Sequence, residues 1–163
     1  MRRSIFLLCV ALGCEQSVPR DCPAGTVPRE ETKDGGRERA CERDGRRQGP
    51  FRSFHASGLE KMVGMYVDGK EEGPWRAFHA DGKAWMRVRF VAGREDGPFE
   101  EWWPGGQRKE EGAYREGKQD GVWTRCGEDG KPRERGRYDR GRRVGAWTYW
   151  DERGQVSRVV DFR

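Results

Sequence analysis

The sequence repeats itself every 24 residues from Gly49 to its C-terminus. Glycines recur at this step in three series: Gly49, Gly73, Gly97, Gly121 and Gly145; Gly58, Gly82, Gly106, Gly130 and Gly154; Gly69, Gly93, Gly117 and Gly141. No insertion or deletion interrupts them. A fixed period of this length is typical of architectures in which each unit packs on its chain neighbours. The period argues against a thick globular core and predicts five units: 49–72, 73–96, 97–120, 121–144 and 145–163.

Aromatic residues keep the same step between the glycines. Their series are Phe51, Trp75, Phe99, Trp123 and Trp147; Phe54, Phe78, Trp102 and Trp150; Tyr66, Phe90, Tyr114, Tyr138 and Phe162. Cys126 stands where the second series would place its fourth aromatic, so we interpret it as a buried apolar substitute and not as a nucleophile.

Each unit is predicted to form two β-strands. In the segment from Ala84 to Val91, apolar residues alternate with charged ones, and only Trp85 breaks the pattern. Glycines mark the turns, as in Asp68-Gly69. Small residues, such as Gly64, Gly112 and Gly136, precede the third aromatic by two positions and leave room for a neighbouring ring to lie over the backbone. The expected fold is all-β: five sequential hairpins in an extended, twisted antiparallel sheet.

These residues resemble a known repeat. The pattern Gly-x-Trp-x-x-Phe, a Gly turn, then Gly-x-Tyr-x-x-Gly-Lys is similar to the MORN repeat, in particular to its bacterial variant in YwqK-type antitoxin-like proteins. The similarity covers Gly49 to Arg163 and implies sequential hairpins and a role in binding. Three departures are local: Cys126 replaces an aromatic, Val88 and Val160 replace glycine, and the last unit stops before its third Gly.

The first residues have the pattern of an export signal. Met1-Arg2-Arg3 is positively charged, an apolar run extends from Ile5 to Leu12, and Gly13 precedes Cys14. A small residue directly before Cys at this place is typical of the bacterial lipobox, which predicts a signal peptide over 1–13 and lipid attachment at Cys14. Because Ala11 stands where that motif favours Leu, cleavage by ordinary signal peptidase, followed by secretion without lipid, is the alternative.

Segment 22–48 carries two further cysteines and no apolar periodicity. An exported chain lies in a compartment where disulfides form, so we predict a bridge between Cys22 and Cys41 that orders a small N-terminal cap after a linker over 14–21. The alternative is a pair of free thiols in a cytosolic linker.

Charge and motifs exclude several classes of function. Without Arg2 and Arg3 the net charge falls from +5 to about +3, and acidic and basic residues alternate, so we expect no nucleic-acid partner. The two histidines, His55 and His79, occupy equivalent places in adjacent units and are too far apart to share a metal. We therefore predict no catalytic, cofactor or metal site, no small-molecule substrate and no enzyme activity.

What remains is a binding role in the cell envelope. Trp103 and Tyr149 lie off the periodic aromatic positions and are our candidates for exposed partner contacts. We predict a lipid-anchored protein whose repeats bind or scaffold another protein, with a soluble secreted or periplasmic form as the alternative localisation. The alternative function is toxin neutralisation of the YwqK type. Recognition of membrane lipid finds little support in a nearly neutral surface.

Overall fold

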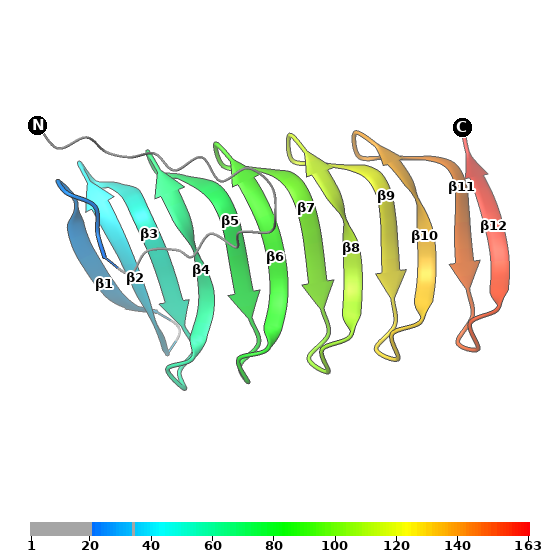
Figure 1. Cartoon of the computed structure of the whole chain (residues 1–163), viewed down its shortest axis with the longest axis horizontal. Helices are drawn as coiled ribbons and strands as arrows, with labels where there is room; N and C mark the ends of the chain where they lie inside the picture. The colour runs from blue at the N-terminus through cyan, green and yellow to red at the C-terminus, as the bar shows by residue number, and fades with distance from the viewer. Residues whose placement is uncertain (1–20, 34) are drawn as a thin grey trace, which may run out of the picture.

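The computed structural model describes residues 21–33 and 35–163; the predicted signal peptide over 1–13, the proposed lipid site Cys14 and the linker residues up to 20 lie outside them. The described chain forms twelve strands in one antiparallel sheet, ordered as in the sequence (Figure 1). The strands are β1 (Val27–Lys33), β2 (Gly36–Arg43), β3 (Arg46–Phe54), β4 (Glu60–Val67), β5 (Lys70–Phe78), β6 (Ala84–Val91), β7 (Arg94–Trp102), β8 (Arg108–Arg115), β9 (Lys118–Cys126), β10 (Pro132–Asp139), β11 (Arg142–Trp150) and β12 (Val156–Phe162).

The predicted fold class is confirmed, and the sheet is longer than predicted. It contains six hairpins, because β1 and β2, within segment 22–48, pair with each other and continue the same sheet through β2 and β3. The two-residue turn Asp44-Gly45 lies 24 residues before Asp68-Gly69 and has the same left-handed backbone, so the period in the structure begins before Gly49. β1 carries no aromatic residue, so the aromatic series that identified the other units did not extend to this hairpin.

Two kinds of turn alternate along the chain. Short turns of two residues follow the even-numbered strands from β2 to β10, and both residues of each have positive φ, as a hairpin turn of type I′ requires. Longer turns follow the odd-numbered strands from β3 onward and close with a bond such as Gly58 N–H to the carbonyl of His55, 2.9 Å. The short turns form the upper edge of the sheet in Figure 1 and the long turns the lower edge.

A bulge follows each short turn and brings the aromatic rings onto the backbone. Val63 pairs with Arg76 and Met65 pairs with Glu72, so Gly73, Pro74 and Trp75 together face Gly64. A Cβ on Gly64 would lie 2.2 Å from the Trp75 ring, which shows that the indole covers the glycine. The same contact joins Trp123 to Gly112 and Trp147 to Gly136, as the spacing predicted.

These rings form the core along one side of the sheet, which we call the ring face. Trp75, Trp123 and Trp147 are almost fully buried, and tyrosines such as Tyr66 and Tyr138 pack edge-to-face against them. A single sheet can therefore bury an apolar layer because each unit covers the backbone of the unit before it. Trp85, which breaks the alternation of β6, is the extra residue of a second bulge between the Ala77–Met86 and Phe78–Ala84 pairs.

The N-terminal end of the sheet is fastened by the segment before β1. The predicted Cys22–Cys41 disulfide is present and joins this segment to β2. The Arg43 guanidinium donates hydrogen bonds to the carbonyls of Ala24 and Gly25, at 3.1 and 3.2 Å. Pro23 lies where a side chain of Gly49 would be, with 2.7 Å between its Cδ and the Cβ position. The segment thus covers the first bulge of the array.

Candidate interaction surface

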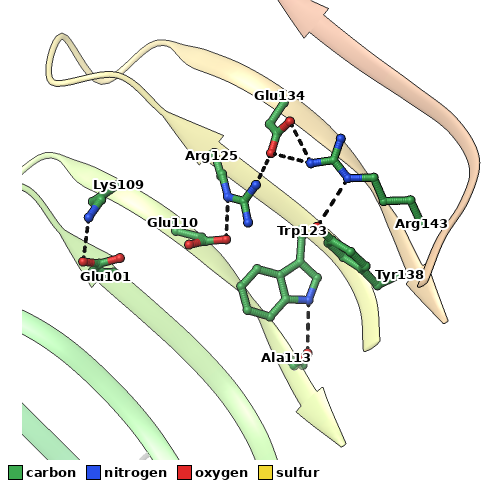
Figure 2. Close-up of polar contacts among 9 residues, drawn as sticks. All are labelled: Glu101, Lys109, Glu110, Ala113, Trp123, Arg125, Glu134, Tyr138 and Arg143. Atoms are coloured by element: carbon green, nitrogen blue, oxygen red, sulfur yellow. Dashed lines mark hydrogen bonds and ion pairs between the residues drawn. The ribbon is translucent and has the colours of Figure 1, made fainter. Parts of the chain in front are cut away.

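A row of charged side chains crosses the ring face in its C-terminal half. Figure 2 shows Glu110 bound to Arg125, Arg125 to Glu134, and Glu134 to Arg143, which joins β8 to β11. Beside them Lys109 binds Glu101 at 2.8 Å. Each of these carboxylates is largely buried, with a side-chain exposure of 15 to 16%. We call this row the charge ladder.

The charged groups of the charge ladder are paired with one another. Burial alone would lower the pKa of Arg125, but Glu110 and Glu134 outweigh it and raise that pKa above its ordinary value. Glu101 and Glu110 are directly opposed on β7 and β8, an arrangement of like charges that Lys109 and Arg125 neutralise. With three cations and three carboxylates, the ladder holds strands in register and leaves no net charge to attract a partner.

The same row has a different character in the N-terminal half of the sheet. The pairs Ser53–Met62 and Ala77–Met86 occupy the places that Glu101–Glu110 and Arg125–Glu134 take further along. Both methionines pack against the buried ring cluster. The repeat thus keeps its backbone while the side chains next to the rings change from apolar to ionic, which makes the two halves of this face chemically distinct.

The two predicted partner-binding aromatics are both partly buried. The Trp103 indole Nε1 donates to the carbonyl of Cys126 at 3.1 Å, and Lys109 Nζ lies 4.8 Å above its ring. The Tyr149 hydroxyl accepts a 2.6 Å bond from Arg143, and the Arg158 guanidinium lies 4.3 Å above the ring. Trp103 lies at a long turn of the lower edge and Tyr149 lies in β11, so the structure does not bring them together at one site.

His55 and His79 occupy the same place in their turns as Trp103. Their Nε2 atoms lie 3.0 Å from the carbonyls of Phe78 and Trp102, respectively. A carbonyl only accepts, so Nε2 carries the proton in both rings. All three side chains therefore link one long turn to the strand end of the next unit. In residues 21–33 and 35–163 no group of three potential ligands is placed to hold a metal ion.

Cys126 lies half-buried at the end of β9, and burial raises the pKa of its thiol above the ordinary value.

A hollow of about 750 Å³ lies beside the Cys22–Cys41 disulfide at the N-terminal end of the sheet. It is lined by Pro28, Pro50 and Phe54 and by the ion pairs Arg39–Glu30 and Arg52–Glu60. Its cations are already bound to carboxylates of the same sheet.

Sequence reasoning missed the charge ladder because the alternation of acidic and basic residues was used only to exclude a nucleic-acid partner. A signal was present: Glu110 and Glu134 are one period apart, as are Glu101 and Arg125. Because Arg125 lies two residues after Trp123 in one strand, and Glu110 and Glu134 are its cross-strand partners, these charged residues lie on the same face as the ring.

No protein-family model matches the chain, and no curated protein shows significant sequence similarity to it. No helix within the described ranges has the length and apolar character needed to cross a membrane.

Proposed function

We propose that the chain is a non-enzymatic binding or scaffolding protein of the MORN-like repeat class, attached to the cell envelope through a lipid on Cys14. The observation that carries the binding role is the single-layer sheet of residues 21–33 and 35–163, in which no second layer of strands or helices covers the two broad faces and two long edges. Repeat proteins use extended surfaces of this kind for partners.

The chemistry of the described side chains supports the same proposal. Both histidines are bonded to backbone carbonyls, and the buried carboxylates are bound to Arg or Lys. Catalytic acids, bases and nucleophiles need a group held ready for a substrate proton or bond. Here the histidines and the buried carboxylates bind other groups of the same sheet.

The contribution of Trp103 to a partner is separable from its role in the turn. Trp103→His should keep the bond to the carbonyl of Cys126, because His55 and His79 make that bond at the equivalent places. We expect Trp103→His combined with Tyr149→Phe to leave the fold intact and to weaken capture of the partner protein.

The experiment is site-specific photocrosslinking in the organism that encodes the chain, with probes on the ring face, the opposite face and both edges. A discrete protein crosslinked from one surface supports the proposal, and Trp103→His with Tyr149→Phe tests the aromatic contribution to it. Absence of any protein adduct from all four surfaces would refute the binding role. Separately, the mass of the mature N-terminus tests the anchor: an unmodified Cys14 contradicts it.

A further inference from the structure

The cations of the sheet fall into two groups that the fold treats differently. Those of the charge ladder are bound to carboxylates, whereas a second set repeats immediately after the short turns: Arg46, Lys70, Arg94, Lys118 and Arg142. All five are exposed, and none forms an ion pair with a described residue. Each is the first residue of an odd-numbered strand, so the set is regular along the upper edge of Figure 1.

Their cross-strand partners extend this set into a strip. Directly opposite residues of an antiparallel pair lie on the same side of a sheet, here the side opposite the ring face. The pairs are Arg43–Arg46, Val67–Lys70, Val91–Arg94, Arg115–Lys118 and Asp139–Arg142. All ten residues are exposed, seven are Arg or Lys, and one is Asp. We call these ten residues the basic strip.

Neighbouring groups reduce this charge without cancelling it. Arg43 is bound to two backbone carbonyls and Arg115 to Asp120. The turn residues Asp44, Asp68 and Glu116 are acidic. Glu72, Asp96 and Asp120 lie on the same side as the strip and accept hydrogen bonds from backbone N–H groups at the short turns. Nearby positive charge comes from Arg89, Arg137 and Arg140. A small excess of positive charge therefore remains along the edge.

Apart from Arg43, which holds the N-terminal segment, and Arg115, which binds Asp120, the cations of the basic strip make no contact within the described chain that stabilises the sheet. Arg115 lies directly opposite Lys118, and Arg43 opposite Arg46, and like charges in such pairs are destabilising. Val67 and Val91 are also 42% and 43% exposed between these cations. Arrangements that cost stability and leave apolar groups in water are typical of surfaces that meet a partner.

We propose that the basic strip binds an acidic, extended segment of a partner protein that carries a carboxylate at about every third residue. This deepens the protein-binding role proposed above and rests on it. Neighbouring strands lie about 4.8 Å apart, so each unit of two strands advances the cations by about 9.6 Å. A polyproline II segment rises about 3.1 Å per residue with three residues per turn, so every third side chain recurs on one side at about 9.3 Å.

The composition of the strip selects a peptide over a nucleic acid. Single-stranded nucleic acids bind to basic grooves that also offer aromatic rings for base stacking, and none of the ten residues is aromatic. Val67 and Val91 instead provide small apolar contacts between the cations, which suit aliphatic side chains placed between the carboxylates of a peptide.

The test measures binding of labelled probes to the full chain by fluorescence anisotropy. The main probe is a peptide of about fifteen residues with glutamate at every third position and valine and serine between, and a second peptide of the same composition groups its glutamates together. An oligothymidylate is the third probe. The strip variant is Lys70→Glu, Arg94→Glu and Lys118→Glu. The control is Lys61→Glu, Arg153→Glu and Arg163→Glu, which reverses three exposed cations outside the strip.

We expect the spaced peptide to bind in a saturable, salt-sensitive manner, at least about tenfold more weakly to the strip variant and within about twofold of wild type to the control. The thermal midpoint of the strip variant should not fall, because Lys118→Glu turns a repulsive pair with Arg115 into an attractive one.

Equal losses in both variants, tighter binding of the grouped peptide or of the oligothymidylate, or no saturable binding of the spaced peptide would overturn the proposal. Such a result is distinguishable from failure of the binding role, since photocrosslinking would still report a protein on another surface.

Discussion

The indole of Trp123 lies flat on the backbone of Gly112, where a Cβ would come within 2.3 Å of the ring. The equivalent contacts show that the two partners are matched in size. Gly64 and Gly136 are covered by Trp75 and Trp147, whereas Ala40 and Val88 face the smaller rings of Phe51 and Phe99. Across the bulge, a large ring is thus fitted to a bare backbone and a smaller ring to a side chain. In the regular pairing on the other side, Trp75 lies opposite Val88 and Phe99 opposite Gly112.

Gly112→Ala should destabilise the sheet because the Trp123 ring has no space to withdraw. We expect the free energy of unfolding to fall by about 1 to 3 kcal/mol, the usual cost of an overpacked core. Urea unfolding followed by tryptophan fluorescence measures it. The double variant Gly112→Ala with Trp123→Phe copies the Ala40–Phe51 pair. Its loss in the free energy of unfolding should be smaller than the sum of the losses in the two single variants. Strict additivity in that cycle would contradict size matching.

Exchanging the pair at Val88 tests the same relationship from the opposite direction. Val88→Gly alone removes a buried side chain, and Phe99→Trp alone crowds Val88, which is only 5% exposed. Together they recreate the Gly–Trp contact seen at Gly112. We expect a favourable coupling of about 0.5 to 3 kcal/mol between the two changes in thermal or urea unfolding. A double variant less stable than the sum of the two single losses would oppose the interpretation.

Arg125→Met should leave Glu110 and Glu134 without the cation that lies between them. Since both carboxylates are largely buried while Arg125 is 39% exposed, we expect a loss of about 1 to 2 kcal/mol in the free energy of unfolding. Arg29→Met is the control: Arg29 is 62% exposed and binds Glu42, so its loss should cost no more than about 0.5 kcal/mol. Similar losses at both positions would show that the charge ladder contributes no more than a surface pair.

Removing the disulfide with Cys22→Ala and Cys41→Ala should lower the free energy of unfolding by about 3 kcal/mol, because the bridge closes a loop with a sequence separation of 19. The effect should be local. Amide hydrogen exchange is expected to speed up in β1 to β3 and to stay unchanged in β9 to β11, which lie far along the sheet. A uniform change along the chain would contradict this.

Cys126 should react slowly in the folded chain. Burial raises the pKa of its thiol, and the thiolate is the reactive form, so alkylation by iodoacetamide at mildly alkaline pH should be slower in buffer than in urea. The raised pKa also determines how stability depends on pH. The contribution of the Cys126 thiol to the free energy of unfolding is complete below its unfolded-state pKa and is lost as the pH rises through its folded-state pKa. Mass spectrometry gives both rates, and equal rates would refute the shift.

The sequence predicted the features that recur every 24 residues and missed the features that depend on which residues pair across strands. The period identified the hairpins, their turns and the ring-on-glycine contact, because each requires a particular residue type at a fixed position. The β1–β2 hairpin lacks rings and was therefore not recognised as part of the sheet. The bulges that place Trp85 and Trp75 follow from the register, which residue types alone do not define.

The candidate surfaces were predictable to a smaller extent. Trp103 was selected because it departs from the aromatic period, yet it keeps the period of His55 and His79, and its indole makes their turn contact. The near-neutral composition gave no sign of the basic strip. Only the strand pairing places Arg115 opposite Lys118, on the other side of the sheet from the carboxylates of the ring face.

Each strand packs extensively only on the strands next to it in sequence. A pulling force applied to the two ends of the sheet therefore meets the hairpins in series, because strands that are not neighbours share few contacts. Such a molecule should yield one hairpin at a time and refold each one against the hairpin next to it when the tension falls. Held at its two ends, the sheet would lengthen stepwise before either attachment fails.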